Sequence, residues 1–250
     1  MEPYRPLQIL GSRVDPVSME EAQQRIAQLL SEHRFAQVVT FGSEMAMLAR
    51  RDAAYRDAVN AADLVVPDTV GVVIAARLLG QPVRERVAGI ELVENICAAC
   101  ARNGTPVFLL GGADGVAQQA GDALVQRHPG LTIAGTHDGY FSEVDDAGVV
   151  ERITASGARL VFVALGFPKQ ELWARAHSTE LGPVVCVGIG GSLDVISGRL
   201  QRAPAVMRKL GLEWLYRLVK EPQRLRRQLA LPQFAFLITG QVLRERLGGM

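Results

Sequence analysis

The stretch Leu160-Val161-Phe162-Val163-Ala164-Leu165-Gly166-Phe167-Pro168-Lys169-Gln170-Glu171 decides the fold of this chain. Its first five residues form a short apolar run, which is typical of a buried strand. Residues 166–168 then break the strand, and residues 170–177 have the pattern of a helix. The polar side chains at 169–171 therefore lie where a strand ends and a helix begins. Ligands of parallel α/β sheets bind beyond the carboxyl ends of the strands, so this stretch predicts a binding crevice. A solvated loop with a proline at the helix start is the alternative.

Apolar runs and helical patterns alternate along the rest of the body. Six strands are predicted, at residues 36–40, 63–66, 105–110, 131–136, 159–164 and 183–187. Helical patterns occur between them, at residues 19–31, 69–79, 91–102, 115–128 and 170–177. Strands separated by helices of this length require crossover connections and a largely parallel sheet. The predicted fold is α/β and Rossmann-like, a largely parallel sheet flanked by helices, with a basic C-terminal helical appendage.

Composition and cysteine usage narrow the class of protein. The chain has 250 residues, of which 48% are hydrophobic and 21% are charged, as expected for a globular protein. Three cysteines provide no disulfide framework and fit a reducing cytoplasm. Residues 1–10 do not have the pattern of a signal peptide, and no 18-residue apolar run is free of charge and proline. We therefore expect a cytoplasmic protein without a transmembrane helix.

The charge is divided unevenly along the chain. Residues 1–198 carry 16 basic and 23 acidic side chains, a net charge of −7, whereas residues 199–250 carry 11 and 3, a net charge of +8. We interpret these parts as an α/β catalytic domain and a basic helical appendage. Basic charge on an acidic body suggests a partner with phosphate groups or an anionic surface. Nucleic acid is not predicted as a partner, because no helix-turn-helix, zinc-finger or RNP-like pattern accompanies the charge.

Polar and glycine-rich clusters follow four of the predicted strands. They are Thr40–Ser43, Pro67–Thr69, Gly111–Gly115 and Gly188–Ser192. If these strand ends share one edge of the sheet, their backbone N–H groups and helix N-termini form a cleft that suits a diphosphate. One Gly-Gly pair is weak evidence, since glycines also serve turns and close packing. Two glycine loops with a carboxylate and a glutamine nearby predict a nucleotide site.

The order of these motifs resembles the WecG/TagA/CpsF family of bacterial glycosyltransferases. The resemblance covers roughly residues 8 to 230 and rests on residues 62–68, 85–92, 111–112, 139–141, 165–171, 188–191, 202–204 and 211–218. It implies inverting transfer of a sugar from a UDP-sugar to a polyprenyl-diphosphate-linked acceptor at the inner face of the cytoplasmic membrane, in cell-surface polysaccharide biosynthesis. It further implies that no metal or other cofactor is required. The oligomeric state is left open, a homo-oligomer included.

The resemblance also implies roles for individual residues. Asp68 is expected to be the catalytic base, with Thr40, Arg86 and Gln170 contacting the substrates. Gly111, Gly112, Gly190, Gly191, Arg217, Arg224 and Arg227 are expected to bind the diphosphate of the sugar donor. Asp68 could instead cap the helix that follows it. Arg86 could instead pair with Glu85 or Glu91, and Lys169 could be an ordinary surface charge.

Two positions depart from the family pattern. The usual Thr-x-Asn becomes Thr40-Phe41-Gly42, so an amide is missing, and the usual Pro-Asp-Gly becomes Pro67-Asp68-Thr69. These changes leave the fold prediction intact but bear on the sugar that is transferred. A nucleotide-sugar-binding homologue without turnover is therefore an alternative function. A Rossmann-type dehydrogenase is disfavoured, because no Gly-x-Gly-x-x-Gly opens the first strand–helix unit.

The C-terminal tail contains an apolar stretch, and the chain also has a closely spaced pair of cysteines. Residues 229–238 are mostly apolar and flanked by arginines, which suits a helix lying in a membrane interface. A helix packed on the body or on another subunit is the alternative. Cys97 and Cys100 have the spacing of a redox or zinc pair, but a helical core face explains them better. The four histidines have no metal-ligand spacing.

Overall fold

The central sheet of the protein is parallel throughout. A computed structural model describes residues 5–80, 83–142, 144–209, 211–220, 225 and 229–248. The strands lie in the order β4 (Leu64–Pro67), β3 (Ala36–Phe41), β8 (Val185–Gly188), β7 (Leu160–Ala164), β5 (Val107–Gly111) and β6 (Ile133–His137). Every neighbouring pair is parallel. All six predicted strands and the α/β class are therefore confirmed.

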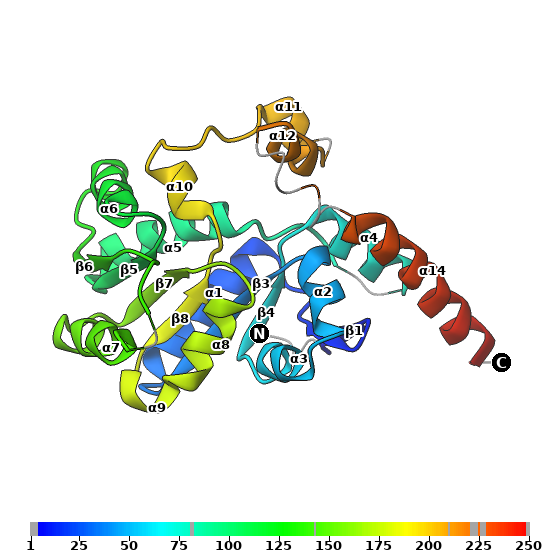
Figure 1. Ribbon diagram of the computed structural model, residues 1–250, viewed down its shortest axis with the longest axis horizontal. Helices are drawn as coiled ribbons and strands as arrows, with labels where there is room; N and C mark the ends of the chain where they lie inside the picture. The colour runs from blue at the N-terminus through cyan, green and yellow to red at the C-terminus, as the bar shows by residue number, and fades with distance from the viewer. Residues whose placement is uncertain are drawn as a thin grey trace.

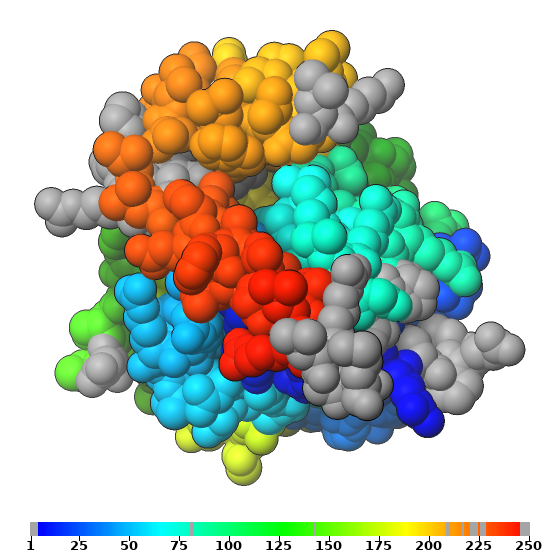
Figure 2. All heavy atoms as spheres, turned by 90° about the vertical axis from the view of Figure 1, so that its right-hand side faces the viewer, coloured from blue at the N-terminus to red at the C-terminus, as the bar shows by residue number. Residues whose placement is uncertain are grey.

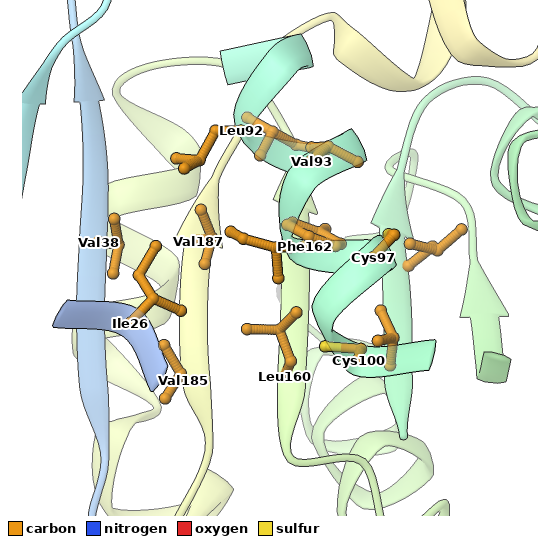
Figure 3. Close-up of a cluster of buried hydrophobic side chains, with 14 of the residues drawn as sticks. Ile26, Val38, Leu92, Val93, Cys97, Cys100, Leu160, Phe162, Val185 and Val187 are labelled. Atoms are coloured by element: carbon orange, nitrogen blue, oxygen red, sulfur yellow. The ribbon is translucent and has the colours of Figure 1, made fainter. Parts of the chain in front are cut away.

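Helices cover both faces of this sheet (Figure 1). One face carries α1 (Met19–Ser31), α5 (Gly89–Asn103), α6 (Val116–Arg127) and α10 (Ser192–Ile196). The other carries α7 (Asp146–Ala155), α8 (Lys169–Ala176) and α9 (Ser178–Leu181). Figure 3 shows the first interface, where Ile26 lies beside Val38 and Val187 in the same apolar cluster as Leu92 and Phe162. Because the central strands are buried on both faces, their sequences are continuous apolar runs.

A further layer of elements covers β3 and β4 on the same face of the sheet as α8. It comprises β1 (Leu7–Ile9), β2 (Ser12–Val14), α2 (Ser43–Ala49), α3 (Ala53–Asn60), α4 (Val70–Leu78) and α14 (Ala230–Gly248), which share one apolar cluster. The sequence did not predict the antiparallel β1–β2 hairpin, because strands of three residues show no clear periodicity. Two of the helices in this layer, α4 and α14, also form walls of the cleft described below.

The helix starts follow local sequence rules. Ser18 accepts a hydrogen bond from the backbone N–H of Glu21, and the Glu21 side chain accepts one from the Ser18 backbone. This reciprocal arrangement is a capping box, and a cap of this kind stabilises a helix by about 1 kcal/mol. It fixes the beginning of α1 at Met19, as predicted.

The C-terminal appendage contains α11 (Ala205–Lys209), α12 (Glu213–Lys220) and α14. Helix α14 packs against α2 and α4, and its side chains Phe234 and Ile238 are buried there. Figure 2 shows α14 lying between α2 and α4. The packed alternative for this segment is thus confirmed, while contact with a membrane stays a prediction. Within the described ranges no helix has the length and hydropathy needed to cross a membrane.

Candidate active site

A cavity of about 600 Å³ opens at the carboxyl edge of the sheet, beyond β4, β3, β8 and β7. Its lining includes six residues that the sequence singled out, namely Thr40, Asp68, Arg86, Gln170, Gly190 and Gly191. They lie at the end of β3, in the loops after β4 and β8, in the loop before α5 and at the start of α8, and the parallel topology brings them together. The crevice predicted beyond the strand ends is therefore present, and the predicted side chains of Thr40, Asp68, Arg86 and Gln170 line it; their roles stay predictions.

The carboxylate of Asp68 is held in this cleft by the start of a neighbouring helix. Its Oδ1 atom accepts a hydrogen bond of 2.8 Å from the backbone N–H of Gly89, the first residue of α5. The backbone N–H of Asp68 donates to the carbonyl of Phe41, which ties the loop to β3. Helix α4 is instead preceded by Thr69, so the predicted alternative that Asp68 caps α4 is wrong. The positive end of the α5 dipole stabilises the charged carboxylate that a base requires.

Thr40 is a buried residue at the end of β3. Its hydroxyl donates a 2.8 Å hydrogen bond to the carbonyl of Gly188 on β8. Because a hydroxyl has a single proton, Thr40 can then offer only its oxygen lone pairs to a ligand.

The carboxamide of Gln170 joins two of the loops at the edge of the sheet. Its Oε1 atom accepts from the backbone N–H of Gly190 at 3.1 Å, and its Nε2 atom donates to Glu171 Oε1 at 2.6 Å. The amide nitrogen carries a second N–H, which is the group that this side chain can present to a substrate. Gln170 therefore orders the glycine loop after β8 while lining the cleft.

Glu171 lies directly behind Gln170 and is almost completely buried. Burial raises the pKa of its carboxyl to about 7. The backbone carbonyl of Glu171 accepts a hydrogen bond from the Gln37 side chain of β3. No role for Glu171 was predicted, although its carboxyl next to Gln170, at the point where a strand ends and a helix begins, is a signal that the sequence contains.

Arg86 reaches the cleft from the loop before α5. Its guanidinium contacts Glu213 of α12 at 3.2 Å, and both side chains are largely buried. The predicted alternative, pairing of Arg86 with Glu85 or Glu91, is wrong. Glu85 accepts instead from the Met19 backbone, and Glu91 pairs with Arg202 and Arg208. Arg86 thus places a positive charge in the cleft and connects it to the appendage.

The two glycine pairs occupy different surroundings. Gly190 and Gly191 line the cavity, whereas Gly111 ends β5, Gly112 follows it, and both are absent from the described lining. A Cβ atom on Gly111 would lie within 2.4 Å of the Ala164 carbonyl oxygen, so close strand packing alone requires glycine there. A role for Gly111 and Gly112 in binding the diphosphate stays a prediction.

The two departures from the family pattern are in contact with each other. A Cβ atom added to Gly42 would lie 3.0 Å from the Cγ2 methyl of Thr69. The Thr69 hydroxyl accepts from the Ser43 backbone at 3.2 Å, and both Gly42 and Thr69 line the cavity. Thr69 therefore fills space that the absence of a side chain at position 42 leaves.

The remaining polar candidates are Lys169 and the three arginines of the appendage. Lys169 is exposed, lies 4.3 Å from the centre of the Phe141 ring and is absent from the described lining of the cleft, so the surface interpretation fits. Arg224 and Arg227 lie outside the described residues, and so does the side chain of Arg217. The roles of these three arginines stay predictions.

The buried cysteines belong to the core. Cys97 and Cys100 of α5 are free and pack in the apolar cluster beneath the sheet, as the core interpretation predicted. Burial raises the pKa of Cys97 and raises that of Cys100 to about 11, which keeps both thiols protonated. In the part of the chain that the structure describes, no three His, Cys, Asp or Glu side chains are grouped to hold a metal ion.

Known proteins match this chain over most of its length. The sequence model of the family described as "Glycosyl transferase WecG/TagA/CpsF family" matches residues 7–248. A protein of Bacillus spizizenii is 35% identical over 217 residues, which cover 87% of this chain and 82% of the relative. One of Staphylococcus aureus strain MW2 is 38% identical over 201 residues, covering 80% and 78%. Both are named N-acetylglucosaminyldiphosphoundecaprenol N-acetyl-beta-D-mannosaminyltransferase.

Proposed function

The chain belongs to the WecG/TagA/CpsF family of glycosyltransferases, and we propose that it transfers an N-acetylhexosaminyl group from a UDP-sugar. The proposed acceptor is N-acetylglucosamine on a polyprenyl diphosphate, in the biosynthesis of a cell-surface polysaccharide. Relatives that cover most of the chain are named for such an acceptor and for an N-acetylmannosaminyl group. UDP-N-acetylmannosamine is therefore the first sugar donor to test.

The observation that carries the proposal is the carboxylate of Asp68 in the lining of the cleft, together with the guanidinium of Arg86 and the glycine loop after β8. Asp68 accepts the proton of the acceptor hydroxyl while the hydroxyl oxygen attacks the anomeric carbon of the donor sugar. The bond from that carbon to the diphosphate oxygen breaks, and its electron pair leaves with UDP. Attack opposite the leaving group converts an α-linked donor into a β-linked product, which agrees with the β-linkage in the relatives' names.

Departure of UDP creates negative charge, and this chain offers groups to stabilise it. Arg86 and the backbone N–H groups of Gly190 and Gly191 lie in the same cavity as Asp68. Preorganised cations and N–H groups directed at a leaving diphosphate lower the barrier of such a step. We therefore propose a reaction without a metal ion, in which Arg217, Arg224 and Arg227 add further positive charge.

The place of action follows from the acceptor. A polyprenyl-linked sugar is held by a membrane, and the basic appendage suits an anionic membrane surface. We propose a peripheral protein at the inner face of the cytoplasmic membrane, where UDP-sugars are available.

The test is a transfer assay with several UDP-N-acetylhexosamines and a water-soluble N-acetylglucosaminyl diphosphate ester, with and without EDTA. We expect release of UDP, a β-linked disaccharide product, and the same rate in EDTA. Binding of UDP without transfer to any acceptor would favour the alternative of a homologue without turnover. Loss of activity in EDTA that Mg²⁺ or Mn²⁺ restores would contradict the metal-free reaction.

A further inference from the structure

Helix α4 presents an apolar stripe to solvent, beginning two residues after Asp68. Val70, Ile74 and Leu78 are spaced by four, so they lie on one face of the helix. Their exposed fractions are 36%, 51% and 50%, although the opposite face of α4 is already packed in the core. Single exposed apolar residues are ordinary, but a continuous stripe that opens from a reaction cleft indicates a binding surface.

Helix α14 forms the facing wall of the same groove. Its residues Leu231, Phe234 and Ile238 line the cavity together with the stripe on α4. Phe234 and Ile238 are themselves buried, so they fix the position of α14 beside α4. Figure 2 shows the two helices side by side on this face of the molecule. None of the described residues that α4 and α14 contribute to the cavity carries a charge.

The apolar groove and the polar cleft are one cavity. Asp68 precedes α4, and Ile74 and Leu78 follow along that helix, so we call the part of the cavity lined by Asp68 and Arg86 its polar end and the part lined by Ile74, Leu78 and Ile238 its apolar end. We propose that the groove between α4 and α14 binds the first isoprene units of the acceptor's polyprenyl chain. This inference rests on the proposed function and adds a lipid-binding subsite to it.

The chemistry of the acceptor places its lipid near this groove. One sugar and a diphosphate are all that separate the reacting hydroxyl from the first isoprene. A hydroxyl positioned at Asp68 therefore brings the start of the lipid to the first turns of α4. Each methylene moved from water onto an apolar surface contributes roughly 0.8 kcal/mol, so a few buried isoprene carbons increase affinity substantially. A charged peptide or a free nucleotide would gain nothing from the uncharged walls.

The test compares two acceptors that differ only in the lipid, N-acetylglucosaminyl diphosphate esterified with methyl or with farnesyl. Both are used below the concentration at which they aggregate and without vesicles, so that membrane partitioning has no part in the result. For the wild-type protein we expect kcat/KM to be at least about tenfold higher with the farnesyl ester. The double substitution Ile74→Ser with Leu78→Ser should remove most of this preference. Val125→Ser is the matched control, because Val125 is 40% exposed on α6, outside the described lining of the cavity.

Two other outcomes would overturn the proposal. One is an unchanged farnesyl preference in the double variant. The other is that light scattering shows a smaller oligomer for the double variant than for the wild-type protein, together with loss of the farnesyl preference. That result would mean that α4 and α14 contact a second copy of the chain. Calorimetric binding of the two esters is measured in all variants, which separates this inference from the proposed function. Failure of transfer with both esters would refute the proposed function, while tighter binding of the farnesyl ester that depends on Ile74 and Leu78 would still support the groove.

Discussion

The two ends of the cleft are built from different parts of the fold. At the polar end, Asp68 and Gly190 follow the tips of β4 and β8, and the sheet's hydrogen bonds hold them in place. At the apolar end, Ile74 of α4 and Phe234 of α14 belong to helices that meet through apolar packing. Residues at rigid strand ends can hold catalytic groups at a fixed position relative to a reacting atom. Side chains on packed helices can provide an apolar surface that binds a flexible hydrocarbon chain. The comparison indicates that chemistry and lipid recognition can be changed separately.

The largest effect on turnover is expected when the proposed catalytic base, Asp68, is replaced. Asp68→Asn should lower turnover by about 10²–10⁴-fold with every acceptor, because the amide cannot accept the hydroxyl proton. Affinity for UDP should change little, and the farnesyl preference should survive because the groove is intact. Steady-state kinetics and UDP calorimetry on the variant measure these quantities.

A matched control lies at the other end of the same strand. Asp63 precedes β4, pairs with Arg34 and accepts from the Gln37 backbone, far along the strand from the cleft. Asp63→Asn should therefore cost some stability but little turnover. If Asp68→Asn were as active as Asp63→Asn, Asp68 would not be the base.

The second test concerns the cation at the polar end. Arg86→Ala should lower kcat/KM by about 10²-fold, since it removes a positive group that faces the leaving diphosphate. Glu213→Gln removes the partner of Arg86 but keeps the guanidinium, and should cost far less. Equal losses in the two variants would mean that Arg86 serves only as an ion pair between the loop and the appendage.

The polar end could be predicted from the sequence because its residues are local to the strands. Thr40, Asp68 and Gln170 each stand at or just beyond the end of an apolar run, and parallel topology places such ends along one edge. The apolar runs also predicted all six strands of the sheet. Buried strands and capped helices leave patterns that a single sequence retains.

The apolar end and the appendage could not be predicted in the same way. Ile74 and Leu78 have the spacing of an ordinary core face, and nothing local shows that their face is left open. Their facing wall comes from the distant helix α14, and Glu213 lies 127 residues from its partner Arg86. Contacts of this kind depend on tertiary packing, which periodicity does not encode.

A third test concerns two positions near the polar end, Gly42 and Thr69, which depart from the family pattern. Each is replaced by the residue that is usual in the family. Gly42→Asn alone should lower turnover about tenfold, because its Cβ meets the Thr69 methyl at 3.0 Å. Thr69→Gly should have a smaller effect, and the double variant should recover much of the loss. A double-mutant cycle on kcat/KM, run with each UDP-sugar, measures the coupling. Additive losses would show that the two positions act independently.

The smallest effect on turnover is expected behind the polar end, at Glu171. Its folded pKa of about 7 exceeds the ordinary value of 4.5, because burial favours the neutral acid. The folded protein then keeps a proton that the unfolded chain loses, so this group makes stability fall as pH rises from about 4.5 to 7. Glu171→Gln should remove that decline, worth about 3 kcal/mol at most, and keep turnover within about threefold.

Urea unfolding of both proteins at pH 5 and pH 7.5 measures the difference. The glutamine oxygen can still accept from Gln170 Nε2, so the cleft should keep its shape. An identical pH dependence of the two unfolding free energies would contradict a neutral buried Glu171.

In the proposed complex one acceptor molecule occupies both ends of the cleft, with its hydroxyl at Asp68 and its lipid between α4 and α14. The most direct measurement is photo-crosslinking with an N-acetylglucosaminyl diphosphate ester that carries a diazirine on the first isoprene. We expect cross-links to residues 70–78 and 231–239, in wild type and in Asp68→Asn alike, and competition by unlabelled farnesyl ester. Cross-links confined to other faces of the protein, or unaffected by that competitor, would contradict the proposed complex.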